Sequence, residues 1–208
     1  GAAGLDGARL YRIDRSSGVA TRVGTATYAI TGAISIDFNP VVDRLRVVSS
    51  DGTNLRVHPD TGALASRDTN LSYAAGDVNA GRAPAVAGVA YTNSDTDPAT
   101  GTELFDVDAA VDSLALQSPP NAGVLTTRGP LPTAIKAGKT GFDIYTRDSG
   151  GKQNWAFVSS FAKGRTTIYE ISTATGAKTS NFIGNGGVLE INPHLTDIAL
   201  PVDQGGVF

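Results

Sequence analysis

Short runs of apolar residues alternate with polar turns along the whole chain, and none of them keeps a helical period. Four of these runs align at their central positions, which are Asp37, Ala90, Asp143 and Asp197. The spacings between them are 53, 53 and 54 residues, and three of the four central residues are aspartates. A fixed period of this size is typical of stacked supersecondary units. The pattern therefore predicts a repeat protein.

Glycines in short polar turns form a second series, with an apolar run close on either side of each. They are Gly18, Gly62, Gly123 and Gly176. A tight reversal between two strands needs a backbone with positive φ, which glycine adopts without a steric penalty. The turns therefore favour antiparallel hairpins.

The clearest unit spans about 33–68. Its four expected strands are 33–38, 44–49, 54–58 and 63–68. Asp51-Gly52 is the strongest hairpin signal in the chain, and as a two-residue loop it would place Val48 opposite Leu55. Apolar residues then fall on both faces of the hairpin, as expected for a propeller blade between two neighbours.

The remaining units follow the same plan. The unit at 86–128 has expected strands at 86–92, 103–107, 113–117 and 123–128, and the unit at 141–183 has them at 141–146, 154–159, 167–171 and 177–183. The two chain ends, 195–208 and 1–24, are expected to share the last unit, with Leu10–Ile13 beside the strand that contains Ile198. We therefore predict a single all-β domain over 1–208, a β-propeller of four-stranded antiparallel blades with four units in this chain.

The amino-acid composition of the chain argues against several classes of function. The chain has 208 residues, a net charge of −3 and interspersed charges, so nucleic acid and anionic membranes are not expected partners. It has no cysteine, which excludes disulfides, thiolate metal sites and a cysteine nucleophile. No apolar run approaches the ~20 residues of a membrane span. Methionine is absent even at position 1, so we expect a processed or truncated product.

Longer motifs carry a family resemblance. The run from Ile36 to Gly62, together with 73–81, 90–94 and 141–144, resembles the bacterial family known as domain of unknown function 4394. The resemblance covers nearly the whole chain. It implies an exported, propeller-like repeat protein that is secreted, periplasmic or on the cell surface, with no established chemistry. It also implies a further unit before Leu10, and so five blades in an intact precursor. Because unpaired edge strands invite association, a truncated chain that does not close its terminal blade is expected to recruit a second polypeptide to complete it.

The recurrent aspartates are the first candidate site. Asp37, Asp143 and Asp197 fall in the strand that lines a propeller axis, where they could bind Ca²⁺ through their carboxylates. The preferred interpretation is structural, with each carboxylate accepting hydrogen bonds from backbone amides or pairing with an arginine. Repetition in several units indicates packing, whereas catalysis would be expected in a single unit. We therefore predict no cofactor, with calcium as the alternative.

Two further groups could bind a ligand. The long connection from Thr69 to Pro84 carries Asp77 and Asn79, and long loops in compact folds often have a function. Arg44 and Arg46 could hold an anion, although ion pairs with Asp37 and Asp43 are the preferred explanation. Trp155 alternates with Phe157 along a strand, as blade packing requires, and a surface for stacking a sugar is the alternative.

No catalytic residue is predicted. The chain has no Gly-x-Ser-x-Gly motif, and its two histidines, His58 and His194, lie in different units. We expect a binding or scaffolding module for a protein or glycan partner, as one subunit of a larger assembly. The alternatives are a calcium-dependent, lactonase-like hydrolase, which a tightly bound metal would reveal, and a structural surface or matrix repeat.

Overall fold

The computed structural model describes residues 7–147, 153–181, 187–191 and 194–200. In these ranges the chain forms β-strands and one short 3₁₀ turn, η1 (Pro120–Ala122), so the all-β prediction is confirmed. No helix within the described ranges has the length and apolar character needed to cross a membrane.

The first large sheet follows the sequence pattern closely. It has the order β3-β4-β5-β6, all antiparallel, and its strands are β3 (Ile34–Asn39), β4 (Arg44–Ser49), β5 (Asn54–Val57) and β6 (Leu64–Arg67). The register of the β4–β5 hairpin differs from the prediction, because Val47 pairs with Leu55 and Val48 with Asn54. The Asp51 carboxylate accepts hydrogen bonds from Ser49 and from the Thr53 amide, which widens the loop beyond two residues.

The second large sheet has one strand more than expected. Its order is β7-β11-β10-β9-β8, formed by β7 (Ser72–Tyr73), β8 (Val86–Tyr91), β9 (Leu104–Asp108), β10 (Ser113–Gln117) and β11 (Val124–Pro130). The short strand β7 comes from the long connection after β6 and pairs in parallel with β11. The prediction of purely antiparallel, four-stranded units is therefore wrong for this sheet.

The third large sheet has a different outer strand from the one predicted. Its order is β12-β13-β14-β15, formed by β12 (Phe142–Arg147), β13 (Gln153–Ala162), β14 (Arg165–Ile171) and β15 (Val188–Ile191). The expected strand at 177–183 contributes only an isolated bridge between Lys178 and Ile171 in its described part. Thr179 and the amide of Asn181 instead bind the Glu170 carboxylate, which draws this segment out of the ladder.

The chain ends do not share a sheet in the described part of the chain. β1 (Tyr11–Ile13) and β2 (Ala20–Arg22) form a two-stranded sheet of their own, and residues 195–200 are not in a strand. The predicted pairing of Leu10–Ile13 with the segment around Ile198 is therefore wrong. Residues 1–6 and 201–208 of the expected terminal unit lie outside the described residues.

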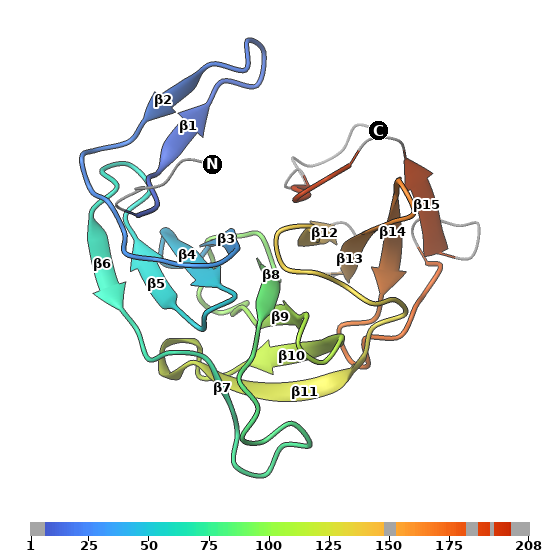
Figure 1. Cartoon of the computed structure of the whole chain (residues 1–208). Coiled ribbons are helices and arrows are strands. Elements are labelled where there is room, and N and C mark those ends of the chain that lie inside the picture. The colour runs from blue at the N-terminus through green and yellow to red at the C-terminus, as the bar shows by residue number, and fades with distance from the viewer. Residues whose placement is uncertain (1–6, 148–152, 182–186, 192–193, 201–208) are drawn as a thin grey trace.

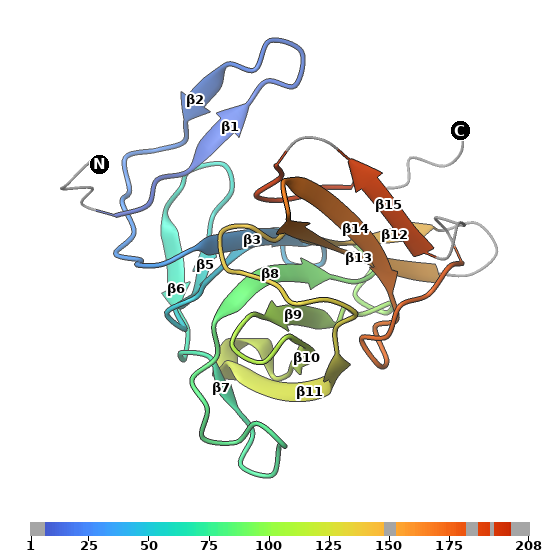
Figure 2. The same ribbon diagram turned by 45° about the vertical axis from the view of Figure 1, so that its right-hand side comes forward.

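The three large sheets follow one another around an arc, with β3, β8 and β12 on its inner side (Figure 1). The β1–β2 hairpin stands apart from the third sheet in both ribbon views (Figure 2). Asp37, Ala90 and Asp143 lie in β3, β8 and β12, the first strand of each large sheet along the chain, as the 53-residue period predicts.

Glycines let neighbouring backbone segments approach the inner strands closely. A Cβ atom added to Gly88 would lie 2.4 Å from the Cβ atom of Phe142, and one added to Gly141 would lie 2.3 Å from the Ile198 nitrogen. No larger side chain fits at that separation. The sheets pack through apolar clusters, one between the first and second sheets around Val48 and Val89, and one between the second and third around Phe105 and Phe142.

Candidate functional site

Asp37 connects the first two inner strands. Its Oδ2 atom accepts a hydrogen bond from the Tyr91 amide of β8 at 2.6 Å, and its Oδ1 atom accepts one from the Phe38 amide at 2.7 Å. Two residues earlier, Ser35 Oγ accepts a hydrogen bond from the Val89 amide at 3.0 Å. Side chains of β3 thus bind backbone groups of β8 that no neighbouring strand satisfies.

Asp143 repeats this arrangement in the third sheet. Its Oδ1 atom accepts a hydrogen bond from the Ile144 amide at 2.7 Å, and its Oδ2 atom accepts one from the Leu200 amide at 2.5 Å. Asp197 accepts a hydrogen bond from the Ile198 amide at 2.9 Å. The backbone hydrogen bonds expected for a structural role are therefore present at all three central carboxylates, Asp37, Asp143 and Asp197.

The central carboxylates influence one another electrostatically. Burial is the main cause that raises the pKa of Asp37 to about 7; the Tyr91 hydrogen bond opposes it, and the Asp143 charge adds to it. Burial likewise raises the pKa of Asp143 to about 6, against its hydrogen bonds and with a contribution from Asp197. Burial also raises the pKa of Asp197. A carboxyl of this kind can hold a proton near neutral pH, which relieves the repulsion between like charges.

A cavity of about 220 Å³ lies beside these carboxylates, between Asp37, Tyr91, Asp143 and Leu200. Ca²⁺ in proteins takes six to eight oxygen ligands at about 2.3–2.6 Å. Within the described ranges, no three His, Cys, Asp or Glu side chains are placed so that they could hold a metal ion. The carboxylates converge on the centre of the arc, but their oxygens bind backbone amides.

Asp77 and Asn79 fasten the long connection to β11. The Asp77 carboxylate accepts hydrogen bonds from the amide and the hydroxyl of Thr127 at 2.6 and 2.7 Å, and from the Asn79 amide at 2.8 Å. Asn79 Nδ2 donates to the Thr127 hydroxyl at 3.0 Å. Burial raises the pKa of Asp77, but the hydrogen bonds from Thr127 and Asn79 outweigh it, so the pKa lies below its usual range. These contacts hold the loop in place.

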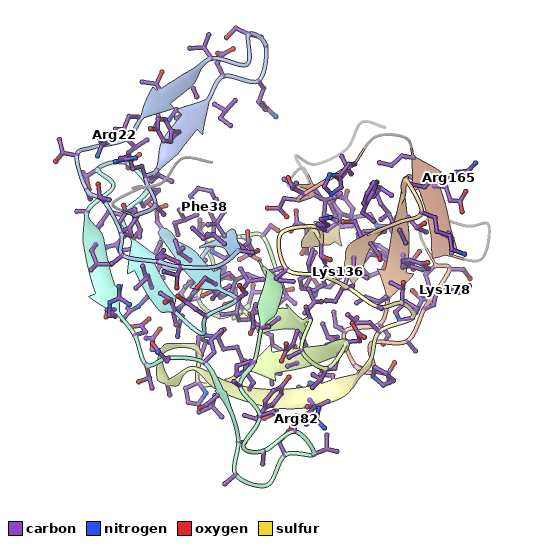
Figure 3. The ribbon with its side chains drawn as sticks, in the orientation of Figure 1. Arg22, Phe38, Arg82, Lys136, Arg165 and Lys178 are labelled. Carbon is purple, nitrogen blue, oxygen red and sulfur yellow. The ribbon has the colours of Figure 1, made fainter. Side chains whose placement is uncertain are left out.

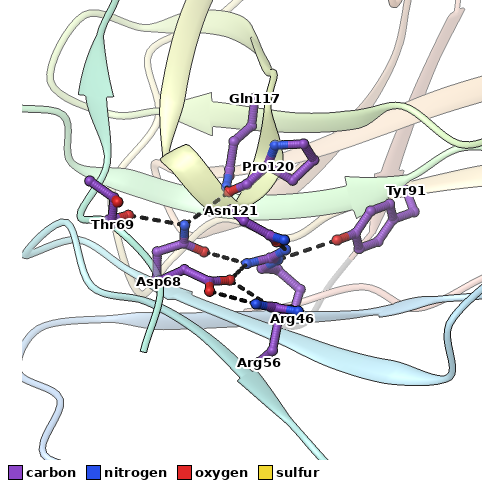
Figure 4. Close-up of polar contacts among 9 residues, drawn as sticks. Arg46, Arg56, Asp68, Thr69, Tyr91, Gln117, Pro120 and Asn121 are labelled. Carbon is purple, nitrogen blue, oxygen red and sulfur yellow. Dashed lines mark hydrogen bonds and ion pairs between the residues drawn. The ribbon is translucent and has the colours of Figure 1, made fainter. Parts of the chain in front are cut away.

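Arg46 is the centre of a buried polar network between the first and second sheets (Figure 4). Its side chain is 2% exposed and donates hydrogen bonds to Asp68, Asn54, Asn121 and Tyr91 at 2.7–3.2 Å. The partner of Arg46 in its ion pair is thus Asp68 of the first sheet, rather than the expected Asp37 or Asp43. Arg56 shares the same carboxylate.

Arg44 takes no part in this network. Its guanidinium is exposed and donates to the carbonyl oxygens of Val42 and Asp43. Arg44 and Arg46 therefore do not converge on one anion, although they lie two residues apart on β4.

Asp106 is a buried acid that pattern analysis missed. It lies on β9 between Val89 and Ala115 of the neighbouring strands, it is fully buried, and neither of its carboxylate oxygens has a hydrogen-bond partner in the described part of the chain. Burial raises its pKa well above the usual range, which the Arg46 charge only partly offsets. An aspartate inside the apolar run Leu104–Asp108 was the available signal.

One face of β3 differs from the corresponding faces of β8 and β12. We call this surface, made of Ile34, Ile36 and Phe38, the β3 face. These side chains are 42%, 45% and 54% exposed, and Phe38 lies at the open side of the arc (Figure 3). The residues 53 and 106 positions later are between 1% and 6% exposed; they are Ala87, Val89, Tyr91, Thr140, Phe142 and Ile144.

A family model places the chain among known sequences. The model described as domain of unknown function (DUF4394) matches residues 3–199. The chain belongs to this family. The resemblance seen in the sequence motifs is therefore confirmed, and it extends over nearly the whole DUF4394 chain. A search of curated proteins found no match. The family description names no activity, so a function has to be argued from the geometry.

Proposed function

We propose that this DUF4394 chain is an exported β-propeller module that binds and scaffolds protein partners through the β3 face. The observation that carries the proposal is the repeat comparison: the β3 face is exposed, whereas both of its counterparts are buried against a preceding sheet. Export rests on the family resemblance, which is to exported repeat proteins.

The contacts of the counterparts define what the β3 face lacks. Val89 and Tyr91 of β8 pack on the first sheet, next to Val48. Phe142 and Ile144 of β12 pack on the second sheet, next to Ala90 and Phe105. In each case one sheet covers the apolar side of the next inner strand. In the described part of the chain, no sheet packs on the β3 face in this way.

The N-terminal segment leaves the β3 face about half exposed. Leu10, Ala26 and Ile30 pack on the cluster that contains Tyr28, Leu45 and Val57. Between Tyr11 and the side chains of Ile36 and Phe38 lies a cavity of about 370 Å³ rather than a packed interface. Within a propeller, β1 and β2 would be the outer strands of a terminal blade whose inner strands are not among the described strands of the chain. The Asp-centred period and the inner-to-outer strand order of the first and third sheets support this interpretation.

Covering the β3 face would be energetically favourable. Full burial of a Leu, Ile or Phe side chain is worth roughly 1.5–3 kcal/mol, and about half of the surface of each of the three residues of the β3 face is still exposed. Monomeric proteins rarely expose contiguous apolar patches of this kind unless they bind something. β3 is also the edge strand of its sheet, and edge strands invite association with another chain.

We take the partner to be a second copy of this chain. In both internal interfaces another repeat of the chain covers the inner strand, so a second copy is a partner built from the same kind of unit. Homo-oligomers are also the commonest protein assemblies. A scaffold made of copies of one chain needs no separate ligand site.

Sedimentation velocity over a range of concentrations tests this function. We expect the purified protein to shift from one chain to two or more as the concentration rises, and Ile36→Asp to remain monomeric. Val78→Asp is the matched control, because Val78 is 84% exposed on the loop before β8 and should associate like the parent. A parent protein that stays monomeric at every concentration would refute self-assembly through the β3 face.

A further inference from the structure

Three side chains of the second sheet leave four buried oxygen atoms without hydrogen bonds. These atoms are Asp106 Oδ1 and Oδ2, Gln117 Oε1 and Ser113 Oγ, and no described residue pairs with them. Asp106 and Gln117 are fully buried, and Ser113 is nearly so. Because buried polar atoms in folded proteins nearly always have a partner, a group of four needs a physical explanation.

The strand register places these side chains on one face of the sheet. Asp106 of β9 lies directly opposite Ala115 of β10. Ser113 and Gln117 are the residues two positions before and two positions after Ala115. Residues two apart in a strand point to the same face, and such diagonal neighbours, with Cα atoms roughly 7–8 Å apart, are within reach of a long side chain. Gln117 is long enough to reach Asp106.

This face is buried against the first sheet. Val89 of β8 pairs with Asp106 on the other side from Ala115, and both Val89 and Ala115 belong to the apolar cluster that includes Val48 of the first sheet. An ionised carboxylate in this interface would have neither water nor a hydrogen-bond donor around it. Such a buried charge is costly, so the carboxyl tends to become neutral.

The cation closest in effect to Asp106 is bound to other groups. Arg46 of β4 acts on Asp106 electrostatically, but it makes four hydrogen bonds elsewhere from a guanidinium that has five N–H donors (Figure 4). Arg56 of β5 likewise binds a carboxylate of the first sheet. The acceptors of the Arg46 hydrogen bonds are Asp68 of β6, Tyr91 of β8, Asn54 and Asn121.

The neighbouring acid on the same strand is also fully bound. Asp108 Oδ2 accepts a hydrogen bond from the Tyr73 hydroxyl of β7 at 2.6 Å, and Oδ1 accepts hydrogen bonds from the amides of Ala85 and Ala110. Asp108 therefore adds a negative charge close to Asp106 and supplies no donor.

Gln117 presents an acceptor that faces away from its own hydrogen bond. Its Nε2 atom donates to the Pro120 carbonyl oxygen at 2.6 Å, which fixes the orientation of the amide, because a flipped amide would bring two oxygens together. Its Oε1 atom is therefore held on the side where no described group donates.

We propose that Asp106 holds a proton in the folded protein and donates it to Gln117 Oε1, which makes the interface between the first and second sheets sensitive to pH. One proton removes the buried charge and supplies the donor that Gln117 lacks. Burial is the main cause that raises the pKa of Asp106 well above its usual range; Arg46 opposes this effect and Asp108 adds to it. Loss of the proton at higher pH would place a charge in the apolar cluster and loosen the interface.

Carbon-13 NMR of the full chain, labelled at the side-chain carboxyl carbons of aspartate, tests the protonation state directly. The signal that disappears in Asp106→Asn identifies Asp106. At pH 5 to 6 we expect this signal to have the chemical shift of a neutral carboxyl, whereas the exposed Asp60 already has that of a carboxylate. An Asp106 signal that ionises together with that of Asp60 would overturn the proposal.

Urea unfolding gives a second readout. Above about pH 4 the folded protein binds the Asp106 proton and the unfolded chain does not, so the urea midpoint of the parent should fall as the pH rises. Asp106→Asn keeps the shape of the side chain and offers an N–H donor to Gln117. Its urea midpoint should fall less than that of the parent between pH 5 and pH 7.5. The contribution of Asp37 is present in both proteins and cancels in this comparison.

Asp108→Asn is the matched control, because Asp108 is equally buried two residues away on the same strand. This substitution disturbs three hydrogen bonds, so it should lower the urea midpoint at both pH values and leave the fall between them as in the parent. Equal falls in the parent and in Asp106→Asn would overturn the proposal. The NMR result does not depend on association through the β3 face, so the two proposals fail or succeed separately.

Discussion

At the residue scale, the recurrent aspartates act as acceptors for backbone amides that face the centre of the arc. Asp37 and Asp143 each bind one amide in their own strand and one amide about 54–57 residues further along the chain. The spacing of these residues was visible in the sequence, and so was their place in the inner strands. The sequence pattern did not show that Asp68 pairs with Arg46, because the two residues become neighbours only when β6 folds back beside β5.

The raised pKa of Asp37 predicts a pH dependence of stability. The folded protein binds a proton on Asp37 up to about pH 7, whereas an unfolded aspartate loses it near pH 4. The folded state thus binds more protons between these values, and the free energy of unfolding falls as the pH rises. Between pH 5 and pH 7.5 the free energy of unfolding, measured with urea, should fall by about 1–2 kcal/mol less in Asp37→Asn than in the parent protein.

Asp60→Asn provides the control for this comparison. Its carboxylate is 80% exposed and contacts only the exposed Arg12 in the described structure, so the substitution should leave the pH dependence unchanged. If the free energy of unfolding changes with pH equally in Asp37→Asn and in the parent, the folded protein does not hold the extra proton at Asp37.

The amide contacts of Asp143 lead to a second prediction. Asp143→Ala removes two acceptors and should lower the free energy of unfolding by about 1–3 kcal/mol. Ca²⁺ should not raise the melting temperature of the parent, because a ligand stabilises only a state that it binds. A rise in melting temperature with Ca²⁺ that disappears in Asp143→Ala would favour the calcium-dependent hydrolase instead.

At the scale of elements, pattern analysis located most strands and failed where side chains redirect the backbone. The inner strands carry long apolar runs and were placed within one or two residues. β7 has only two residues and pairs with β11 through Ser72 and Ala74, too short a stretch to produce a periodic signal. The outer strand of the third sheet was misplaced because the buried Glu170 carboxylate binds the segment that otherwise continues the ladder.

The Arg46 network should be the main polar link between the first two sheets. Arg46→Met would remove the hydrogen bonds that Arg46 donates to Asn54, Asn121 and the Tyr91 hydroxyl, and one of the two arginines that pair with Asp68. Removing one partner of a buried ion pair typically costs about 3–5 kcal/mol; since Arg56 stays, we expect about 2–4 kcal/mol in urea unfolding.

Arg44→Met is the matched control on the same strand. In the described part of the chain the Arg44 guanidinium donates exposed hydrogen bonds to two backbone carbonyls, so its loss should cost less than about 1 kcal/mol. Equal destabilisation by the two substitutions would show that the network contributes no more than surface contacts do.

At the scale of the whole molecule, the repeat explains both what the fold buries and what it leaves open. Each sheet covers the apolar side of the next inner strand, and the β3 face is the member of this series that no described sheet covers. The sequence period predicted the equivalence of the inner strands. It could not show that Leu10–Ile13 and residues 195–200 do not pair, because such pairing depends on contacts between segments that share no local signal.

Hydrogen exchange at β3 tests the central claim most directly. If a second copy covers the β3 face, amides in residues 34–39 should exchange more slowly as the protein concentration rises. Amides in residues 86–91 and 142–147 should not change, because neighbouring sheets already cover these counterparts. Exchange at residues 34–39 that is the same at every concentration would contradict self-assembly through the β3 face.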